Sequence, residues 1–146
     1  MATVSPAEQE IRKLNMELRY FEQTADALQQ RLSMLNAAMT DLTYANMTLE
    51  SIEKEKENAE MMVPIGGSSY INVKLATPDK IVVGMGSGVS VEKTLPEAKD
   101  LMKQRLDDLE KTRTQAQQQL SQIVERINQG RTRMESLLSG IRQGQQ

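Results

Sequence analysis

Residues 6–61 carry hydrophobic side chains at gaps that alternate between three and four residues. This spacing places one apolar stripe along a helix and is typical of a coiled-coil seam. Charged residues and Gln fill the other faces, and the single polar position within the series is Asn46. A polar residue in a seam can fix the register at some cost in stability. The stripe consists of Ile11, Leu14, Leu18, Phe21, Ala25, Leu28, Leu32, Leu35, Met39, Leu42 and Leu49.

The ends of this first helix are predicted by local signals. Ser5 and Glu8 have the spacing of a capping box, and Pro6 suits the first helical position. Pro64 disfavours helical geometry in the residue before it, so the helix should end just upstream. The sequence therefore predicts a helix over residues 6–61, with residues 1–5 as a flexible end.

A second helix is predicted over residues 95–142, with residues 143–146 as a flexible end. Thr94 and Glu97 repeat the capping-box spacing, and Pro96 lies in the first turn. Arg113 and Gly130 occupy the two seam positions that have no hydrophobic side chain. The apolar positions are Leu95, Ala98, Met102, Leu106, Leu109, Ala116, Leu120, Ile123, Ile127, Met134, Leu137 and Ile141.

Neither amphipathic helix can bury its stripe alone, so the two should pack as an antiparallel coiled coil. If the numbers of facing residues sum to about 155, the apolar residues of the two seams match position for position. Ala25 then faces Gly130, and the seam is weakly packed where these two small residues meet. A register one heptad away keeps the pattern but leaves one helix end overhanging. We therefore predict the first register.

The middle of the chain, residues 62–94, has the alternation and turn signals of four short strands in two β-hairpins. The fold class is thus mainly α: a long two-helix coiled coil joined by two small hairpins. Such short sheets cannot hide their apolar face or their edges alone, so we expect them to pair with other subunits. The side chains expected to do so are Val63, Ile65, Ile71, Val73, Leu75, Ile81, Val83, Val89 and Val91.

Composition narrows the possible functions. The chain contains no His and no Cys, which removes imidazole, thiolate and the usual zinc or haem ligands, and makes disulfides impossible. We expect no catalytic, cofactor-binding or metal site. A net charge of −2 gives no overall attraction to nucleic acid. Only 3% of the residues are aromatic, which argues against a thick enzyme-like core.

No targeting signal is apparent. Residues 1–10 are polar, without the continuous apolar stretch of a secretory signal. No segment approaches the length and hydrophobicity of a membrane span. The expectation is a protein of the cytoplasm that binds neither membranes nor nucleic acid.

Three local patterns have alternative interpretations. Residues 84–88 (Gly-Met-Gly-Ser-Gly) resemble a phosphate-binding loop, but strand residues follow them where a helix would be needed, which favours a hairpin turn. Four glutamates at helical spacing are compatible with a metal or acid–base site, although interleaved lysines favour a solvated face. A group of arginines near the C-terminus is compatible with nucleic-acid binding, but glutamates dilute its charge and no aromatic residues are interleaved to stack on bases. The residues are Glu50, Glu53, Glu57 and Glu60, and Arg126, Arg131, Arg133 and Arg142.

The ten methionines are unusual, because their flexible side chains suit surfaces that accept many apolar shapes. Several belong to the seams. Met16, Tyr20 and Leu138 lie off the seam near the open end of the helix pair and predict an adaptable apolar tip. The alternative is scattered surface hydrophobes that need no explanation. The neighbouring seam residues included in this candidate tip are Ile11, Leu14, Leu137 and Ile141.

The central segments Met62–Tyr70 and Asp79–Thr94 resemble the hairpin region of archaeal prefoldin alpha subunits. The strings Val-Pro-Ile-Gly-Gly and Val-Gly-Met-Gly-Ser-Gly-Val-Ser-Val-Glu-Lys-Thr carry the resemblance. The order of helix, two hairpins and helix extends it to the whole chain. Two hairpins are a feature of the alpha class, whereas the beta class has one.

The resemblance implies a hexamer of two alpha and four beta subunits, whose strands form a β-barrel platform from which coiled coils extend. Such complexes hold unfolded client proteins at the coil tips without ATP and deliver them to a group II chaperonin. On this sequence the tip would be residues 8–22 with 130–142. The alternative is a coiled-coil scaffold or tether that binds one specific partner; an enzyme is the third and least supported class.

Overall fold

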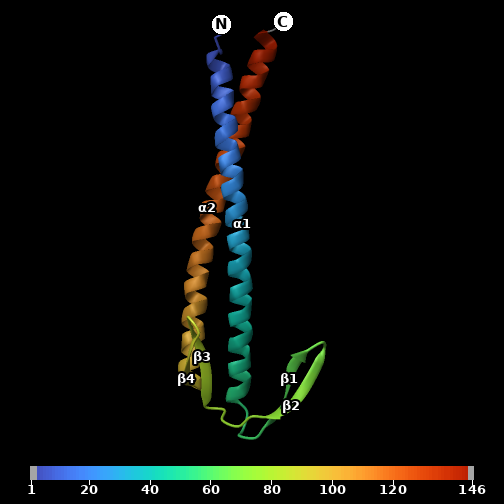
Figure 1. The fold of residues 1–146 in the computed structure, drawn as a ribbon. Coiled ribbons are helices and arrows are strands. Elements are labelled where there is room, and N and C mark those ends of the chain that lie inside the picture. Colours follow the sequence, from blue (N-terminus) through green and yellow to red (C-terminus); the bar gives the residue numbers. More distant parts are fainter. Residues whose placement is uncertain (1–2, 145–146) are drawn as a thin grey trace. The chain divides into compact units, whose positions relative to one another are not determined.

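The computed structural model describes residues 3–144, which form two long helices joined by two antiparallel β-hairpins (Figure 1). This mainly α fold confirms the predicted class. In chain order the elements are α1 (Pro6–Glu53), β1 (Glu60–Gly66), β2 (Ser69–Lys74), β3 (Lys80–Gly86), β4 (Val89–Thr94) and α2 (Leu95–Gly144).

The chain divides into two compact units, and each helix contributes to both. Residues 1–36 and 111–146 form the terminal unit, in which the first turns of α1 and the last turns of α2 lie at the same end (Figure 1). Residues 37–110 form the hairpin unit, which holds all four strands.

Both predicted helix starts are confirmed. The Glu8 amide donates to the Ser5 hydroxyl at 3.2 Å, and the Ser5 amide donates to the Glu8 carboxylate at 3.3 Å. The Glu97 amide donates to the Thr94 hydroxyl at 3.3 Å. These bonds satisfy amides that have no partner within the first turn of a helix.

The predicted end of the first helix is wrong: α1 stops at Glu53 rather than at residue 61. The apolar stripe had already ended at Leu49, so the charged residues that follow have no seam to join. The backbone beyond them is used by the first hairpin instead, because the Leu75 amide donates to the Ala59 carbonyl at 2.9 Å. Pro64 therefore marked only an outer limit for the helix.

The second helix is longer than predicted, because α2 continues to Gly144. Residues 143 and 144, which we expected in a flexible end, are helical. Residues 3–5 precede α1 without regular structure. Residues 1–2 and 145–146, the remainder of the expected flexible ends, lie outside the described residues.

In the terminal unit the seam residues are less exposed than their neighbours on both helices, as predicted. The register, however, is the one we had set aside. A Cβ added to Gly130 would lie 2.8 Å from Leu18 Cδ2, and the Arg113 guanidinium donates to Asn36 Oδ1 at 3.4 Å. Facing numbers therefore sum to about 148, one heptad below the predicted 155.

The early end of α1 explains this difference. The predicted register aligned helix ends on the assumption that α1 reached residue 61, eight residues beyond its actual end. With α1 ending at Glu53, the register near 148 brings the ends of the two helices level. It also sets the large Leu18 opposite Gly130, where the predicted register had left Ala25 opposite Gly130.

Gly130 gives a direct test of this register. Replacing it with Leu adds a side chain where Leu18 already lies, so we expect the free energy of unfolding to fall by about 1–3 kcal/mol. Gly130→Ala should lower the free energy of unfolding much less. Ala is more favourable than Gly within a helix by about 1 kcal/mol, and the end of the Leu18 side chain can move to make room for the added methyl group. Urea unfolding followed by circular dichroism measures both; equal stability of Gly130→Leu and the unchanged chain would contradict the register.

The two hairpins have the predicted turns. In the first, Gly67 and Ser68 have φ values of 55° and 58°, and in the second, Ser87 and Gly88 have 53° and 77°. Positive φ at both central residues defines the type I′ turn, whose twist matches that of antiparallel strands. The Gly-rich run over residues 84–88 thus belongs to a strand and a hairpin turn, and no helix begins there.

The second hairpin packs on the helices of the hairpin unit (Figure 1). Val83, Leu49 and Ala98 form a core cluster with exposed fractions of 1%, 6% and 0%. The Arg105 guanidinium of α2 donates to the Gly84 carbonyl of β3 at 2.7 Å, which adds a polar link beside this core. The β3–β4 sheet is therefore held on one face by its own chain.

Candidate functional site

The hairpins present exposed apolar side chains to solvent, including five of the nine that were predicted to mediate assembly. Val73, Leu75 and Ile81 are half-buried. The prediction is wrong for Val83, whose side chain is buried in the core of its own subunit and is therefore not available to a neighbouring chain. The exposed five are Val63, Ile65, Ile71, Val89 and Val91.

Four further exposed apolar residues lie on the strands and were not among those predicted to mediate assembly: Met62, Tyr70, Val82 and Met85. In the sequence Tyr70 alternates with the polar residues Asn72 and Lys74, which predicts a polar face there. Yet Met62 and Tyr70 are 63% and 58% exposed on one face of the first sheet, while Val63 and Ile71 pair across strands on the other. The sequence did contain a signal for these residues, because the strands carry apolar side chains on both faces. That pattern is typical of strands that are covered on both sides.

The strand edges are also available for pairing. Each sheet within the described residues contains two strands, so β1, β2, β3 and β4 each bond to a neighbouring strand on one side. Open edges expose rows of amides and carbonyls that can accept another strand. The first hairpin therefore offers two apolar faces and two edges.

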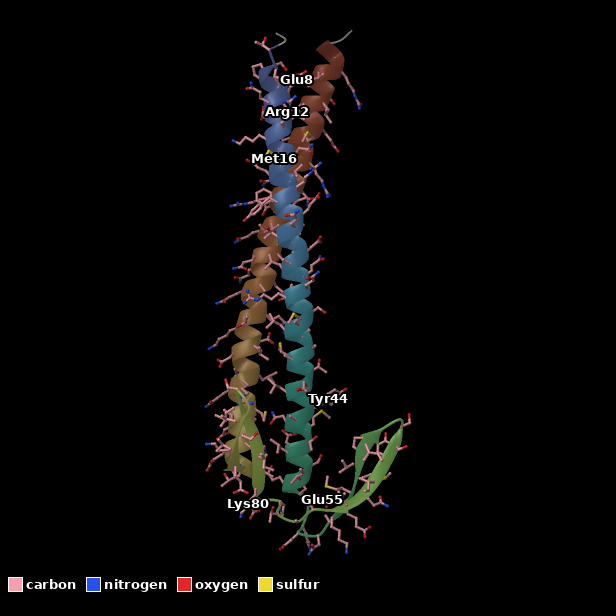
Figure 2. All side chains as sticks on the ribbon, in the orientation of Figure 1. Glu8, Arg12, Met16, Tyr44, Glu55 and Lys80 are labelled. Atoms are coloured by element: carbon pink, nitrogen blue, oxygen red, sulfur yellow. The ribbon has the colours of Figure 1, made fainter. Side chains whose placement is uncertain are left out.

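A groove in the hairpin unit lies between the last turns of α1 and the base of the first hairpin. Its apolar lining includes Met47, Ile52 and Leu75. Tyr44 and Glu55, which Figure 2 labels, also line it. Tyr44 and Met47 are 64% and 56% exposed. Apolar surface therefore continues from the strands onto the end of α1.

The structure divides the predicted tip residues into two groups. Ile11, Leu14, Leu137 and Ile141 are half-buried in the seam of the terminal unit. The exposed side chains are those of Met16, Tyr20 and Leu138, at 73%, 64% and 40%.

The three exposed tip residues do not form one cluster. Met16 and Tyr20 lie one turn apart on α1, and Met16 is about 200° around the helix from the seam residue Leu14. Figure 2 shows Met16 on the side of α1 that faces away from α2. Leu138 follows a seam residue directly and lies at the flank of the helix pair.

Ion pairs flank the seam of the terminal unit. Arg131 contacts Glu22 at 3.0 Å, and Arg133 contacts both carboxylate oxygens of Glu10, at 3.0 and 3.3 Å. The Arg126 guanidinium lies 5.9 Å from the centre of the Phe21 ring. These side chains are exposed, so each pair contributes at most about 1 kcal/mol. Two of the four arginines singled out in the sequence thus form ion pairs with α1, and Arg126 contacts an aromatic ring of α1.

The four glutamates considered as a metal or acid–base site do not share a helical face. Glu53 ends α1, Glu57 lies in the connection and Glu60 begins β1. Glu53 instead accepts a hydrogen bond from Lys99 Nζ at 2.8 Å. Within residues 3–144 no group of three or more carboxylates is arranged to hold a metal ion.

The Glu53–Lys99 pair predicts a pH effect. The hydrogen bond and charge of Lys99 lower the pKa of Glu53, and the bond to Glu53 raises the pKa of Lys99. The pair should therefore contribute at neutral pH and lose its effect as pH falls through the pKa of Glu53, or rises through that of Lys99. NMR titration should show the Glu53 pKa rising in Lys99→Met; an unchanged value would contradict the assignment.

Neither described helix contains a stretch apolar enough to cross a membrane.

Comparison with known proteins gives a consistent result. The family model described as prefoldin subunit matches residues 21–139. Prefoldin subunit alpha of Methanococcoides burtonii is 37% identical over 103 residues, which cover 70% of this chain and 75% of that protein. Prefoldin subunit alpha of Methanosarcina mazei is 36% identical over 112 residues, or 75% and 77% of the two chains.

A solved structure supports the fold. The filamentous PFD from Methanocaldococcus jannaschii, determined by cryo-EM, superposes with a TM-score of 0.68 and 23% identity. The match covers 78% of this chain and 94% of that one. Together, the long helices, the paired hairpins and the family match over most of the sequence show that the chain belongs to the prefoldin alpha subunit family.

Proposed function

We propose that this chain is the alpha subunit of a hexameric chaperone, with two alpha and four beta subunits, that holds unfolded proteins without ATP in the cytoplasm. The complex would then pass its clients to a group II chaperonin. Membership of the prefoldin alpha subunit family is the observation that carries this proposal. The family is one of chaperone subunits rather than enzymes.

The hairpins support the assembly role. Ile65 and Ile71 are 66% and 51% exposed, and the open strand edges next to them need partners. Strands of beta subunits and of the second alpha subunit would cover this surface in a shared β-barrel. Burial of apolar side chains and pairing of strand edges would then stabilise the hexamer.

The terminal unit supports the client-holding role. Met16 and Tyr20 are among the most exposed large apolar side chains of the unit. A Met side chain adapts to many apolar shapes, so such contacts need no particular client sequence. Several weakly binding tips on one platform raise the effective concentration, so a client can be held firmly and still released without ATP.

Serine substitutions test the tip in the assembled complex. Replacing Met16 and Tyr20 by Ser should raise the concentration needed for half-maximal suppression of client aggregation about tenfold, since two partly buried contacts of about 0.7 kcal/mol each are lost. Leu138→Ser, tested separately, should have a smaller effect because that side chain is less exposed.

Met34→Ser is the matched control for this experiment. Met34 is 74% exposed on α1 of the same unit but lies outside the proposed tip. Sedimentation must show that every variant still forms a hexamer. Full suppression by the Met16→Ser, Tyr20→Ser hexamer, or equal loss in the Met34→Ser control, would refute the assignment of client binding to this tip.

A further inference from the structure

The outer face of α1 near its N-terminus combines cations with exposed apolar side chains. Five residues recur there at the one-turn and two-turn spacings that place side chains on a common helix face. All five are exposed, and Figure 2 labels Arg12 and Met16 among them. We name this surface the outer patch: Arg12, Lys13, Met16, Arg19 and Tyr20.

The outer patch contains no carboxylate. Glu8, one turn before Arg12, is exposed at its N-terminal border and accepts a hydrogen bond from the Ser5 amide (Figure 2). The other acidic residues of these turns lie beside the seam. Glu10 and Glu22 pair with arginines of α2, and Glu17 lines a groove with Arg126 at the junction of the helices. Within residues 3–144, no ion pair engages the three cations of the outer patch. Apart from Glu8, the segment thus directs its negative charge toward α2 and its positive charge toward solvent.

The kind of cation also differs between the two units. The terminal unit holds eight of the nine arginines and has ten basic and seven acidic residues, a formal charge of +3. The hairpin unit holds seven of the nine lysines and has eight basic and thirteen acidic residues, a formal charge of −5. Arginine is enriched at protein contacts and lysine is depleted there, because guanidinium is the more weakly hydrated group.

We propose that the outer patch selects, among unfolded proteins, segments that combine carboxylates with aromatic side chains. Arg12 and Arg19 would bind carboxylates through paired N–H donors and stack on aromatic rings. Met16, which lies between them, and Tyr20, which follows Arg19 directly, supply the apolar contact on the same face. This selectivity rests on the proposed client-holding function and adds a chemical class of client to it.

A polypeptide fits this surface better than a nucleic acid. The patch has three cations over about 12 Å of helix, and its two large apolar side chains are 73% and 64% exposed. Binding to phosphates relies on a denser row of charges, and binding to bases relies on several stacking aromatics. The patch offers one aromatic ring, that of Tyr20.

The test uses complexes assembled with a beta-type subunit and two chemically unfolded proteins of similar length and mean hydropathy, one acidic and one basic. Arg12→Glu with Arg19→Glu should raise the concentration for half-maximal suppression at least fivefold for the acidic client. The basic client should be held equally well or better. High salt should reduce the difference between the two clients, because it screens exposed charges.

Two further variants separate the contributions. Arg12→Lys with Arg19→Lys keeps the charge but removes the guanidinium, and should weaken holding of the acidic, aromatic-rich client about two- to threefold. Lys103→Glu with Lys111→Glu makes the same charge change at exposed positions outside the patch and should leave both clients unaffected. Loss of holding in this control would assign the effect to net charge and overturn the proposal.

The remaining outcomes are also decisive. If the unchanged complex holds both clients and the Arg12→Glu, Arg19→Glu variant holds them equally well, the selectivity is refuted while the holding function stands. If the unchanged complex holds neither, the proposed function itself fails. Salt-sensitive binding of a single-stranded oligonucleotide, measured by fluorescence anisotropy and lost in that variant without any change in client holding, would assign the patch to nucleic acid.

Discussion

Replacing Val83 by Asp is expected to lower the free energy of unfolding of the hairpin unit by about 3–5 kcal/mol. Val83 is 1% exposed and packs with Leu49 and Ala98, so an aspartate there would place an unpaired carboxylate in an apolar core. The second hairpin should then separate from the helices. Urea unfolding of the chain, followed by circular dichroism, measures the loss.

The neighbouring residue provides a matched control. Val82 lies on the opposite face of β3 and is 72% exposed. Val82→Asp introduces the same charge one residue away and should change the stability of the isolated chain by less than about 0.5 kcal/mol. Equal destabilisation by the two substitutions would show that the β3–β4 sheet does not pack on the helices through its Val83 face.

Replacing Ile65 and Ile71 together by Asp is expected to abolish assembly with beta-type subunits while the isolated chain stays folded. Both side chains are more than half exposed on the first hairpin, so aspartate costs little in the free chain. In the complex two carboxylates would be buried without partners, a penalty of several kcal/mol that corresponds to at least a hundredfold loss of affinity.

Size-exclusion chromatography with light scattering measures this loss of assembly. Thr77→Asp, in the exposed connection between the hairpins, serves as a control for added charge and should assemble normally. A hexamer that survives Ile65→Asp with Ile71→Asp would contradict the role of the first hairpin as an assembly surface. Val82→Asp gives an independent test of the exposed face of the second hairpin.

The sequence predicted the parts of the fold that depend on local chemistry. The seam spacing identified the buried face of both helices, the Ser5 and Thr94 caps identified their starts, and the Gly-Ser pairs identified the hairpin turns. In each case a short-range physical requirement acts on a few neighbouring residues. Such requirements can be recognised without knowing the tertiary contacts.

The parts that were missed depend on competition between distant segments. The residues after Glu53 have helical spacing, yet the hairpin ladder uses the backbone at Ala59, and that choice also moved the coiled-coil register by one heptad. Likewise, periodicity showed that the strands have apolar faces but not that Val83 would be covered by the subunit's own helices. Only the packing of the unit distinguishes an internal apolar face from an external one.

The candidate tip shows the same distinction. Met16, Tyr20 and Leu138 were grouped because they lie near one end of the helix pair, but their heptad positions place Leu138 at the flank and Met16 on the outer face. The sequence contained this information, since the rotation of each residue from the seam is fixed by helix geometry. The same geometry separates the cations of the outer patch from the glutamates beside the seam.

Light scattering from a chemically unfolded protein, diluted without nucleotide, tests the central claim most directly. The chain alone and the purified complex with a beta-type subunit are compared at equal concentrations, and the hexamer is confirmed beforehand by sedimentation. The account predicts that the hexamer suppresses aggregation at near-stoichiometric concentrations, with no requirement for ATP. A confirmed hexamer that leaves aggregation unchanged would contradict the chaperone function and favour a scaffold that binds one specific partner.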